Sequence, residues 1–204
     1  MTQALHLPSQ VKLASRVIAV VSSAGGIAAL GRVLAELPKD LAAAVLVVQH
    51  LLASRPSHLA EILGWHTALT VEEARPGRQP RNGTVYVAPP DAHLIVGANR
   101  RLQLSQLPPL HFCRPSGDRL FESLATTFGP RAIAVILTGT GRDGAAGAQI
   151  LRQHGGTVIV QDPPTAEFLG MPKAALEAGA VDRVLPLAEI ARALESLAVS
   201  GEPV

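Results

Sequence analysis

The stretch "RVIAVVSSAGGIAALGRVLAEL", residues 16–37, leads from a β-branched run through a Ser-Ser-Ala-Gly-Gly turn into a helical pattern. A short apolar run such as 17–21, bounded by turn residues, is typical of a strand buried on both faces. The helical segment that follows has one apolar face, formed by Ile27, Leu30, Val33, Leu34 and Leu37. Together they predict a buried strand that passes directly into a helix.

The same alternation of apolar runs and helical patterns continues along the chain. Further strands are expected at 42–50, 131–140 and 157–162, with a short one in "DRVLP". Helices are expected around 57–65 and in "PSGDRLFESLATTFG" with Ser116 as N-cap, "GAAGAQILRQHGG", "MPKAALEAGA" and "LAEIARALESLA". The segment 83–106 alternates and carries turn residues, so it predicts an antiparallel hairpin. We therefore predict a doubly wound, three-layer α/β/α fold with a mostly parallel sheet and a small antiparallel hairpin excursion.

The composition limits the class of protein. A chain of 204 residues with 48% hydrophobic and 17% charged residues predicts one folded domain, residues 1–204, with its core at about 16–198. The net charge of +2 and the 3% of aromatic residues argue against nucleic-acid binding. The single cysteine, Cys113, fits a reducing compartment, and no signal peptide or membrane-length apolar run is present. We expect a cytoplasmic protein without membrane insertion.

Polar residues follow three of the predicted strands. Ser22 and Ser23 come after the first strand, His50 ends the second, and Asp143 lies in "TGTGRDGAAG" after the strand at 131–138. Because ligands of parallel sheets bind outside the carboxyl ends of the strands, we expect these side chains to share one crevice. A serine, an imidazole and a carboxylate are the groups that nucleophilic acyl transfer requires.

The glycines of the first turn fit the same chemistry. Gly25 and Gly26 would let a substrate approach the backbone, and free amides at the start of the following helix could donate to an oxyanion. Each residue also has a simpler interpretation. Ser22 could be a helix N-cap, His50 a core histidine, and Asp143 a turn or capping residue.

A different interpretation uses the second glycine-rich turn. Gly139, Gly141 and Gly144 match G-x-G-x-x-G between a strand and a helix, and Asp162 follows about 20 residues later, as in dinucleotide-binding folds. The carboxylate of Asp143 would however lie close to the pyrophosphate. A dinucleotide-binding or non-catalytic module therefore remains the alternative.

The other histidines do not have metal-ligand spacing, so we expect no metal and no cofactor. Surface or packing roles are expected for His6, His58, His66, His93, His111 and His154. "EEAR", residues 72–75, and "RQPR", residues 78–81, are expected to be solvated loops.

Six segments in this order give the chain a family resemblance. They are "SSAGG", "VVQH", "VYVAPPDAHL", "CRPSGDRLFESL", "AVILTGTGRDGAAG" and "FLGMPKAAL". Over residues 16–195 the chain resembles the catalytic domain of the chemotaxis receptor protein-glutamate methylesterases, which also act as glutamine deamidases. The resemblance implies hydrolysis of γ-glutamyl methyl esters on the cytoplasmic domain of methyl-accepting chemoreceptors, with release of methanol.

The resemblance also implies roles for individual residues. Ser23 matches the nucleophile, His50 the general base and Asp143 the carboxylate that orients it. Ala24, Gly25, Gly26 and Thr140 match the oxyanion and substrate-binding positions. Ala24, Thr140 and Cys113 depart from the residues common in the family, which have Thr, Met and His there.

Family members usually begin with a phosphorylatable receiver domain. Only about sixteen residues precede the first predicted strand here, so we expect no receiver domain in this chain.

Overall fold

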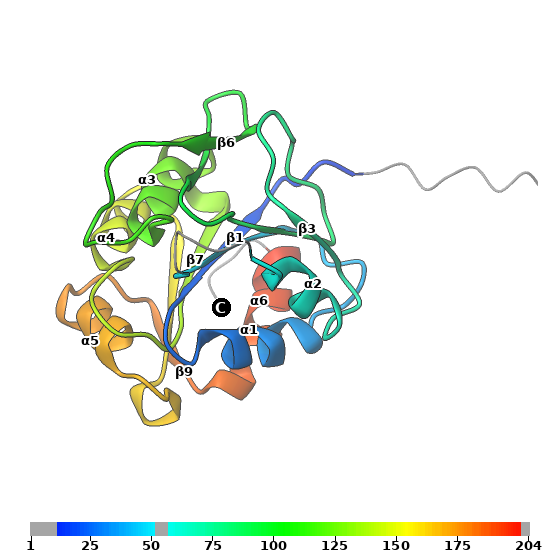
Figure 1. Cartoon of the computed structure of the whole chain (residues 1–204). Helices are drawn as coiled ribbons and strands as arrows, with labels where there is room; N and C mark the ends of the chain where they lie inside the picture. Colours follow the sequence, from blue (N-terminus) through cyan, green and yellow to red (C-terminus); the bar gives the residue numbers. More distant parts are fainter. Residues whose placement is uncertain (1–11, 52–56, 201–204) are drawn as a thin grey trace, which may run out of the picture.

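The computed structural model describes residues 12–51 and 57–200 (Figure 1). Its strands are β1 (Val17–Ser22), β2 (Ala44–Gln49), β3 (Thr70–Glu73), β4 (Thr84–Val87), β5 (His93–Val96), β6 (Leu102–Ser105), β7 (Ala132–Ile136), β8 (Thr157–Gln161) and β9 (Arg183–Leu185). Its α-helices are α1 (Gly26–Ala35), α2 (Leu59–Gly64), α3 (Gly117–Thr127), α4 (Ala145–Gln153), α5 (Gly170–Glu177) and α6 (Leu187–Ser200).

Seven strands form one parallel sheet in the order β3-β4-β2-β1-β7-β8-β9. β5 and β6 pair separately as an antiparallel hairpin, and β5 packs against α3. The strand order reverses between β1 and β7, which in doubly wound sheets is where a ligand crevice opens. The predicted fold class is confirmed.

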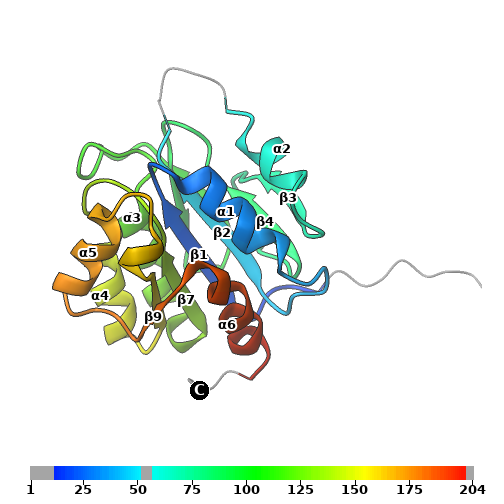
Figure 2. The same cartoon turned by 90° about the horizontal axis from the view of Figure 1, so that it is seen from below.

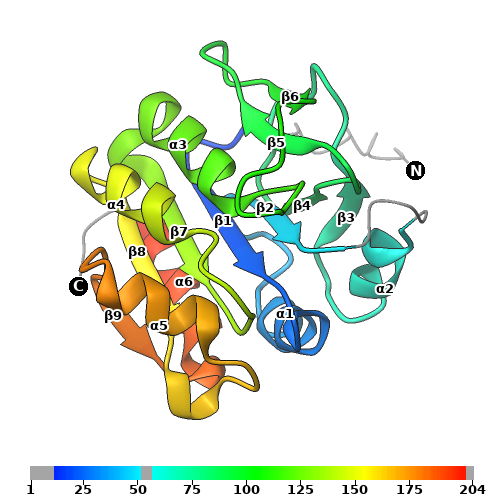
Figure 3. The same cartoon turned by 60° about the vertical axis from the view of Figure 1, so that its left-hand side comes forward.

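Helices cover both faces of the sheet. Figure 2 shows α1 and α6 on one side, and Figure 3 shows α3, α4 and α5 on the other. Alternate residues of β1 serve the two faces: Ile18 and Val20 pack with α1 and α6, whereas Val21 packs with α3. Burial on both sides explains why the central strands are continuous apolar runs. Ile27, expected on the buried face of α1, is instead 42% exposed.

Two segments differ from the sequence prediction. β4 was expected in the antiparallel hairpin, but it lies in the main sheet, parallel to β2 and β3. All four residues of β4 are buried, so the alternating sequence of this segment does not correspond to a strand with one face in solvent. The interpretation of 72–75 as a solvated loop was wrong for Glu72 and Glu73, which belong to the edge strand β3. An edge strand lacks the apolar run that identifies a buried one.

Residues 12–51 and 57–200 contain no helix long and apolar enough to cross a membrane.

α3 and α4 approach each other closely at Gly147. Its amide donates a hydrogen bond of 2.7 Å to Asp118 Oδ1, and an added Cβ would lie 2.7 Å from the Asp118 Cα atom. Such a separation is shorter than van der Waals contact, and the nearest atoms belong to backbone. The absence of a side chain at Gly147 therefore sets the distance between the two helices.

We predict that Gly147→Ala lowers the free energy of unfolding by about 1–3 kcal/mol, because the methyl group must push α3 away. The matched control is Gly31→Ala in α1, where an added Cβ has its nearest neighbour 3.8 Å away. That substitution should stabilise the protein by about 0.5–1 kcal/mol through helix propensity. Urea denaturation measures both, and stabilisation by both substitutions would contradict the close packing.

Candidate active site

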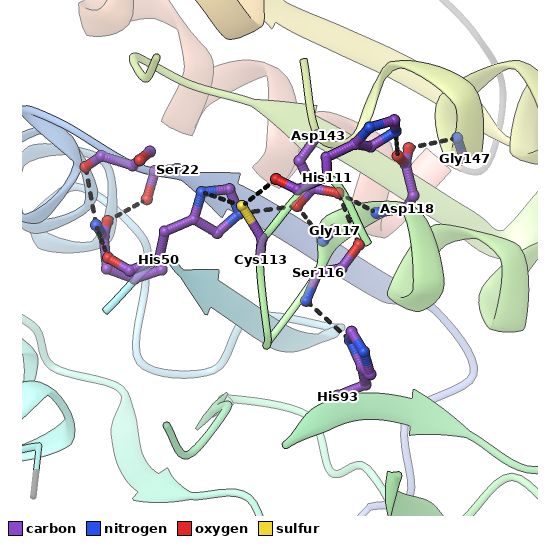
Figure 4. Close-up of polar contacts among 12 residues, drawn as sticks. Ser22, His50, His93, His111, Cys113, Ser116, Gly117, Asp118, Asp143 and Gly147 are labelled. Atoms are coloured by element: carbon purple, nitrogen blue, oxygen red, sulfur yellow. Dashed lines mark hydrogen bonds and ion pairs between the residues drawn. The ribbon is translucent and has the colours of Figure 1, made fainter. Parts of the chain in front are cut away.

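The carboxyl ends of three adjacent strands carry the residues that the sequence singled out. β1 lies between β2 and β7, so the turn after β1, His50 after β2 and the loop after β7 meet at one edge of the sheet. His50 Nε2 lies 2.8 Å from Asp143 Oδ2 although the two residues are 93 positions apart in the sequence (Figure 4). Parallel pairing in register brings these ends together.

Asp143 is buried and accepts hydrogen bonds from several sides. Besides His50, its donors are the Ser116 hydroxyl at 2.7 Å and the amides of Gly117 and Asp118 at 2.6 and 3.2 Å. Burial alone would raise the pKa of Asp143, but the hydrogen bonds from imidazole, hydroxyl and amide groups outweigh burial and lower it. Asp143 therefore stays ionised beside His50.

These contacts change the role expected for Ser116. Ser116 does occupy the N-cap position of α3, but its hydroxyl makes no capping hydrogen bond and points to Asp143 instead. The carboxylate of Asp143 accepts from the first amides of α3, where the helix dipole favours a negative charge. The helix is capped from a distant loop, which local sequence patterns do not reveal.

His50 has a partner on each ring nitrogen. Nε2 faces Asp143, and Nδ1 lies 3.5 Å from Cys113 Sγ (Figure 4). Burial disfavours the imidazolium, but the hydrogen bonds and charges of Asp143 and Cys113 outweigh it and raise the pKa of His50 from 6.5 to about 9. The contact of Cys113 with the imidazole was not predicted from the sequence, in which Cys113 was noted as the single cysteine and as a departure from the family.

Ser23 lies beside His50 in two cavities of about 430 and 450 Å³. The first is lined by Ser23, His50, His111, Phe112, Cys113, Thr140, Gly141, Arg142 and Asp143. Within residues 12–51 and 57–200, the structure records no hydrogen bond from the Ser23 hydroxyl. The hydroxyl is thus free to meet a bound molecule in the cavity that the imidazole also lines.

Ser22 has a different environment from its neighbour. It is the last residue of β1, fully buried, and its hydroxyl donates a 2.6 Å hydrogen bond to Gln49 Oε1. The N-cap of α1 is Gly25, so the interpretation of Ser22 as a helix cap was wrong. Consecutive residues of an extended chain point in opposite directions, which separates the two serines.

The turn after Ser23 offers backbone donors beside the hydroxyl. The Gly26 amide already donates a hydrogen bond of 2.9 Å to the Ser23 carbonyl. Among the described residues, no acceptor is recorded for the amides of Ala24 and Gly25, which line the second cavity with Ser23. Thr140 is exposed and lines the first cavity.

Thr138 fixes this turn to the neighbouring loops. Its carbonyl accepts from the Ser23 amide at 3.1 Å, and its hydroxyl donates to the Ala24 carbonyl at 3.1 Å. The amide of Phe168 donates to the same hydroxyl at 2.8 Å. This role of Thr138 was not predicted; the one signal in the sequence was a polar residue at the end of the buried apolar run 132–137.

The dinucleotide interpretation is not supported. An added Cβ at Gly139 would overlap with Met171 Sδ and lie 2.9 Å from Ser23 Cβ, so this glycine is explained by packing. Asp143, inside the motif, carries an ionised carboxylate that is bonded to His50 and to α3. A pyrophosphate at the start of α4 would meet this negative charge.

Of the remaining histidines, His58, His66 and His154 are exposed, as expected. His93 is buried and accepts from the Ser116 amide at 3.2 Å, a packing role as expected. His111 lines the cavity and pairs with Asp118 at 3.5 Å, so it belongs to the site although no role there was predicted. His6 lies outside the described residues. The described part of the chain contains no group of three or more potential metal ligands.

Comparisons with known proteins agree with the fold. Residues 18–194 match the family model described as CheB methylesterase. A protein-glutamate methylesterase/protein-glutamine glutaminase of Cupriavidus pinatubonensis is 42% identical over 190 residues, which are 93% of this chain and 56% of the relative. Another, of Geobacillus kaustophilus, is 45% identical over 185 residues, covering 89% and 53%. This chain therefore spans about half the length of the curated relatives it matches.

The crystal structure of the Thermotoga maritima CheB methylesterase catalytic domain superposes with a TM-score of 0.85 at 37% identity. The match covers 89% of this chain and 98% of that one. The family model, the two relatives and the Thermotoga maritima structure agree with the family resemblance found in the sequence. The chain belongs to the CheB methylesterase family.

Proposed function

We propose that this chain is a serine hydrolase that demethylates glutamate γ-methyl esters on the cytoplasmic helices of methyl-accepting chemoreceptors. Ser23 is the nucleophile, His50 the base and Asp143 the carboxylate that orients the base. The observation that carries the proposal is the bond between His50 and Asp143, in a cavity that Ser23 also lines. Family membership supports this choice of reaction, since the relatives are named protein-glutamate methylesterases.

In the proposed reaction, each ring nitrogen of His50 has one task. Nε2 is held by Asp143, so Nδ1 takes the proton of Ser23 as its oxygen attacks the ester carbonyl carbon. The free amides of Ala24 and Gly25 stabilise the oxyanion. Nδ1 then returns the proton to the departing methoxide, and methanol leaves.

A water molecule completes the reaction by hydrolysing the acyl-enzyme, with His50 again accepting a proton. The product is the γ-carboxylate of glutamate. The same steps on a glutamine side chain release ammonia instead of methanol, and the glutaminase part of the relatives' names supports this second activity.

The loss of the Ser23 hydroxyl tests the nucleophile. Ser23→Ala should lower methanol release from a methylated chemoreceptor cytoplasmic fragment by about 10³-fold or more, because the acyl-enzyme cannot form. Ser105→Ala in the β5–β6 hairpin removes a hydroxyl away from the site and should keep the parent rate. If Ser23→Ala keeps the parent rate as well, another residue is the nucleophile.

Cys113 should control the pH at which His50 becomes a base. The imidazole must be neutral to accept a proton, and its pKa of about 9 keeps it charged near neutral pH. Cys113→Ala removes a contact that raises this pKa. The pKa of His50 should fall, and the acidic limb of kcat/KM should move to lower pH.

Titration of the histidine ring signals by NMR measures the shift directly, with His50→Gln identifying the His50 signal. A His50 titration curve that is the same in the parent and in Cys113→Ala would contradict the assigned role of the thiol.

A further inference from the structure

Gln49 links the two residues that the proposed reaction brings together. It is the last residue of β2, 4% exposed, and its side-chain nitrogen donates to two backbone carbonyls. One is the carbonyl of Ser23 at 2.8 Å, and the other is that of His50 at 3.1 Å. A single amide group thus joins the backbone of the proposed nucleophile to that of the proposed base.

The orientation of the Gln49 amide is determined by its partners. Both carbonyls can only accept, so Nε2 must face them. Oε1 is then directed to the Ser22 hydroxyl, which donates to it at 2.6 Å. Within the described part of the chain, the hydrogen bonds of this side chain are all to Ser22, Ser23 and His50, and a rotated amide would place an oxygen against two carbonyls.

The first turn of α1 leaves room for this side chain. An added Cβ at Gly26 would overlap with Gln49 Oε1 and lie 2.7 Å from the Ser22 Oγ atom. The Gly26 amide donates to the same Ser23 carbonyl that accepts from Gln49. Position 26 must therefore be glycine for the Gln49 side chain to occupy its observed position.

We propose that Gln49 is a positioning residue that sets the distance between Ser23 and His50. The paired register of β1 and β2 ends at Ser22 and Gln49, and one further backbone hydrogen bond, from the His50 amide to the Ser22 carbonyl at 3.1 Å, holds His50 to β1. Among the described residues, the backbone of Ser23 makes no such bond to β2, and the Gln49 amide joins its carbonyl to that of His50. A displacement of about 1 Å between reacting groups can cost about 10²-fold in rate. This inference rests on the proposed roles of Ser23 and His50.

Gln49→Met tests the proposal, because methionine has a similar length but no amide. With methylated chemoreceptor fragment, we expect kcat to fall by about 10- to 100-fold with little change in KM. The acidic limb of the pH profile should not move, because Gln49 contacts neither ring nitrogen of His50. Gln103→Met, at an exposed position of β6, is the matched control and should keep the parent kcat.

A second, milder variant tests the same role in case Gln49→Met does not fold. Ser22→Ala leaves Gln49 in place but removes the hydroxyl that holds its Oε1, so kcat should fall in the same direction by a smaller factor. Circular dichroism and thermal melting establish that each variant is folded. A folded Gln49→Met protein with the parent kcat, or with a change in KM alone, would overturn the positioning role.

The outcome also separates this inference from the proposed function. If the parent protein releases no methanol, the proposed substrate is wrong, and the variants are compared by the rate at which a fluorophosphonate probe labels Ser23. Slower labelling of Gln49→Met than of the parent supports the positioning role, and equal labelling overturns it. If the parent protein is not labelled at Ser23, the nucleophile and this inference are both wrong.

Discussion

The buried carboxylate of Asp143 is the interaction on which the geometry of the site depends. It receives hydrogen bonds from His50 after β2, from the Ser116 hydroxyl and from the first amides of α3. A buried charge persists only when its oxygens are satisfied, so each contact also holds the others in place. The loop after β7, the end of β2 and the start of α3 are thereby fixed around one group.

The buried carboxyl of Asp118 lies beside that of Asp143, and its pKa is shifted in the opposite direction. Burial raises the pKa of Asp118 to about 6, while the amide of Gly147 works against this shift and the charge of Asp143 adds to it. Within the described residues its Oδ2 makes no hydrogen bond, and it lies 3.5 Å from His111 Nε2. Neighbouring carboxyls disfavour each other's ionised form, so the negative charge of Asp143 helps to raise the pKa of Asp118. Below about pH 6 Asp118 is protonated, whereas Asp143 keeps its charge beside His50.

Much of this arrangement could be predicted from the sequence, because strand ends of a parallel sheet share one edge. The apolar runs located β1, β2 and β7; His50 directly follows β2, and Asp143 lies in the loop after β7. The pairing of His50 with Asp143 was implied by the family resemblance, but the other side-chain contacts of the site were not predictable. That Cys113 reaches His50, or that Asp143 caps α3, depends on the path of loops whose sequences have no regular period. β3 was not recognised because this edge strand lacks an apolar run, and β4 was assigned to the hairpin because its alternating sequence continues into β5 and β6.

The "SSAGG" turn shows how chemistry and packing act on the same residues. The proposed reaction needs one hydroxyl and an open approach, which Ser23 and the following glycines would provide. The structure adds that Ser22 must hold Gln49, and that an added Cβ at Gly25, where φ is +73°, would lie 2.8 Å from Glu167 Oε2. Both glycines are therefore already required by the folded chain before any substrate binds. A substitution in this turn would disturb the support of the site together with access to it, so reduced activity alone cannot be attributed to the oxyanion contacts.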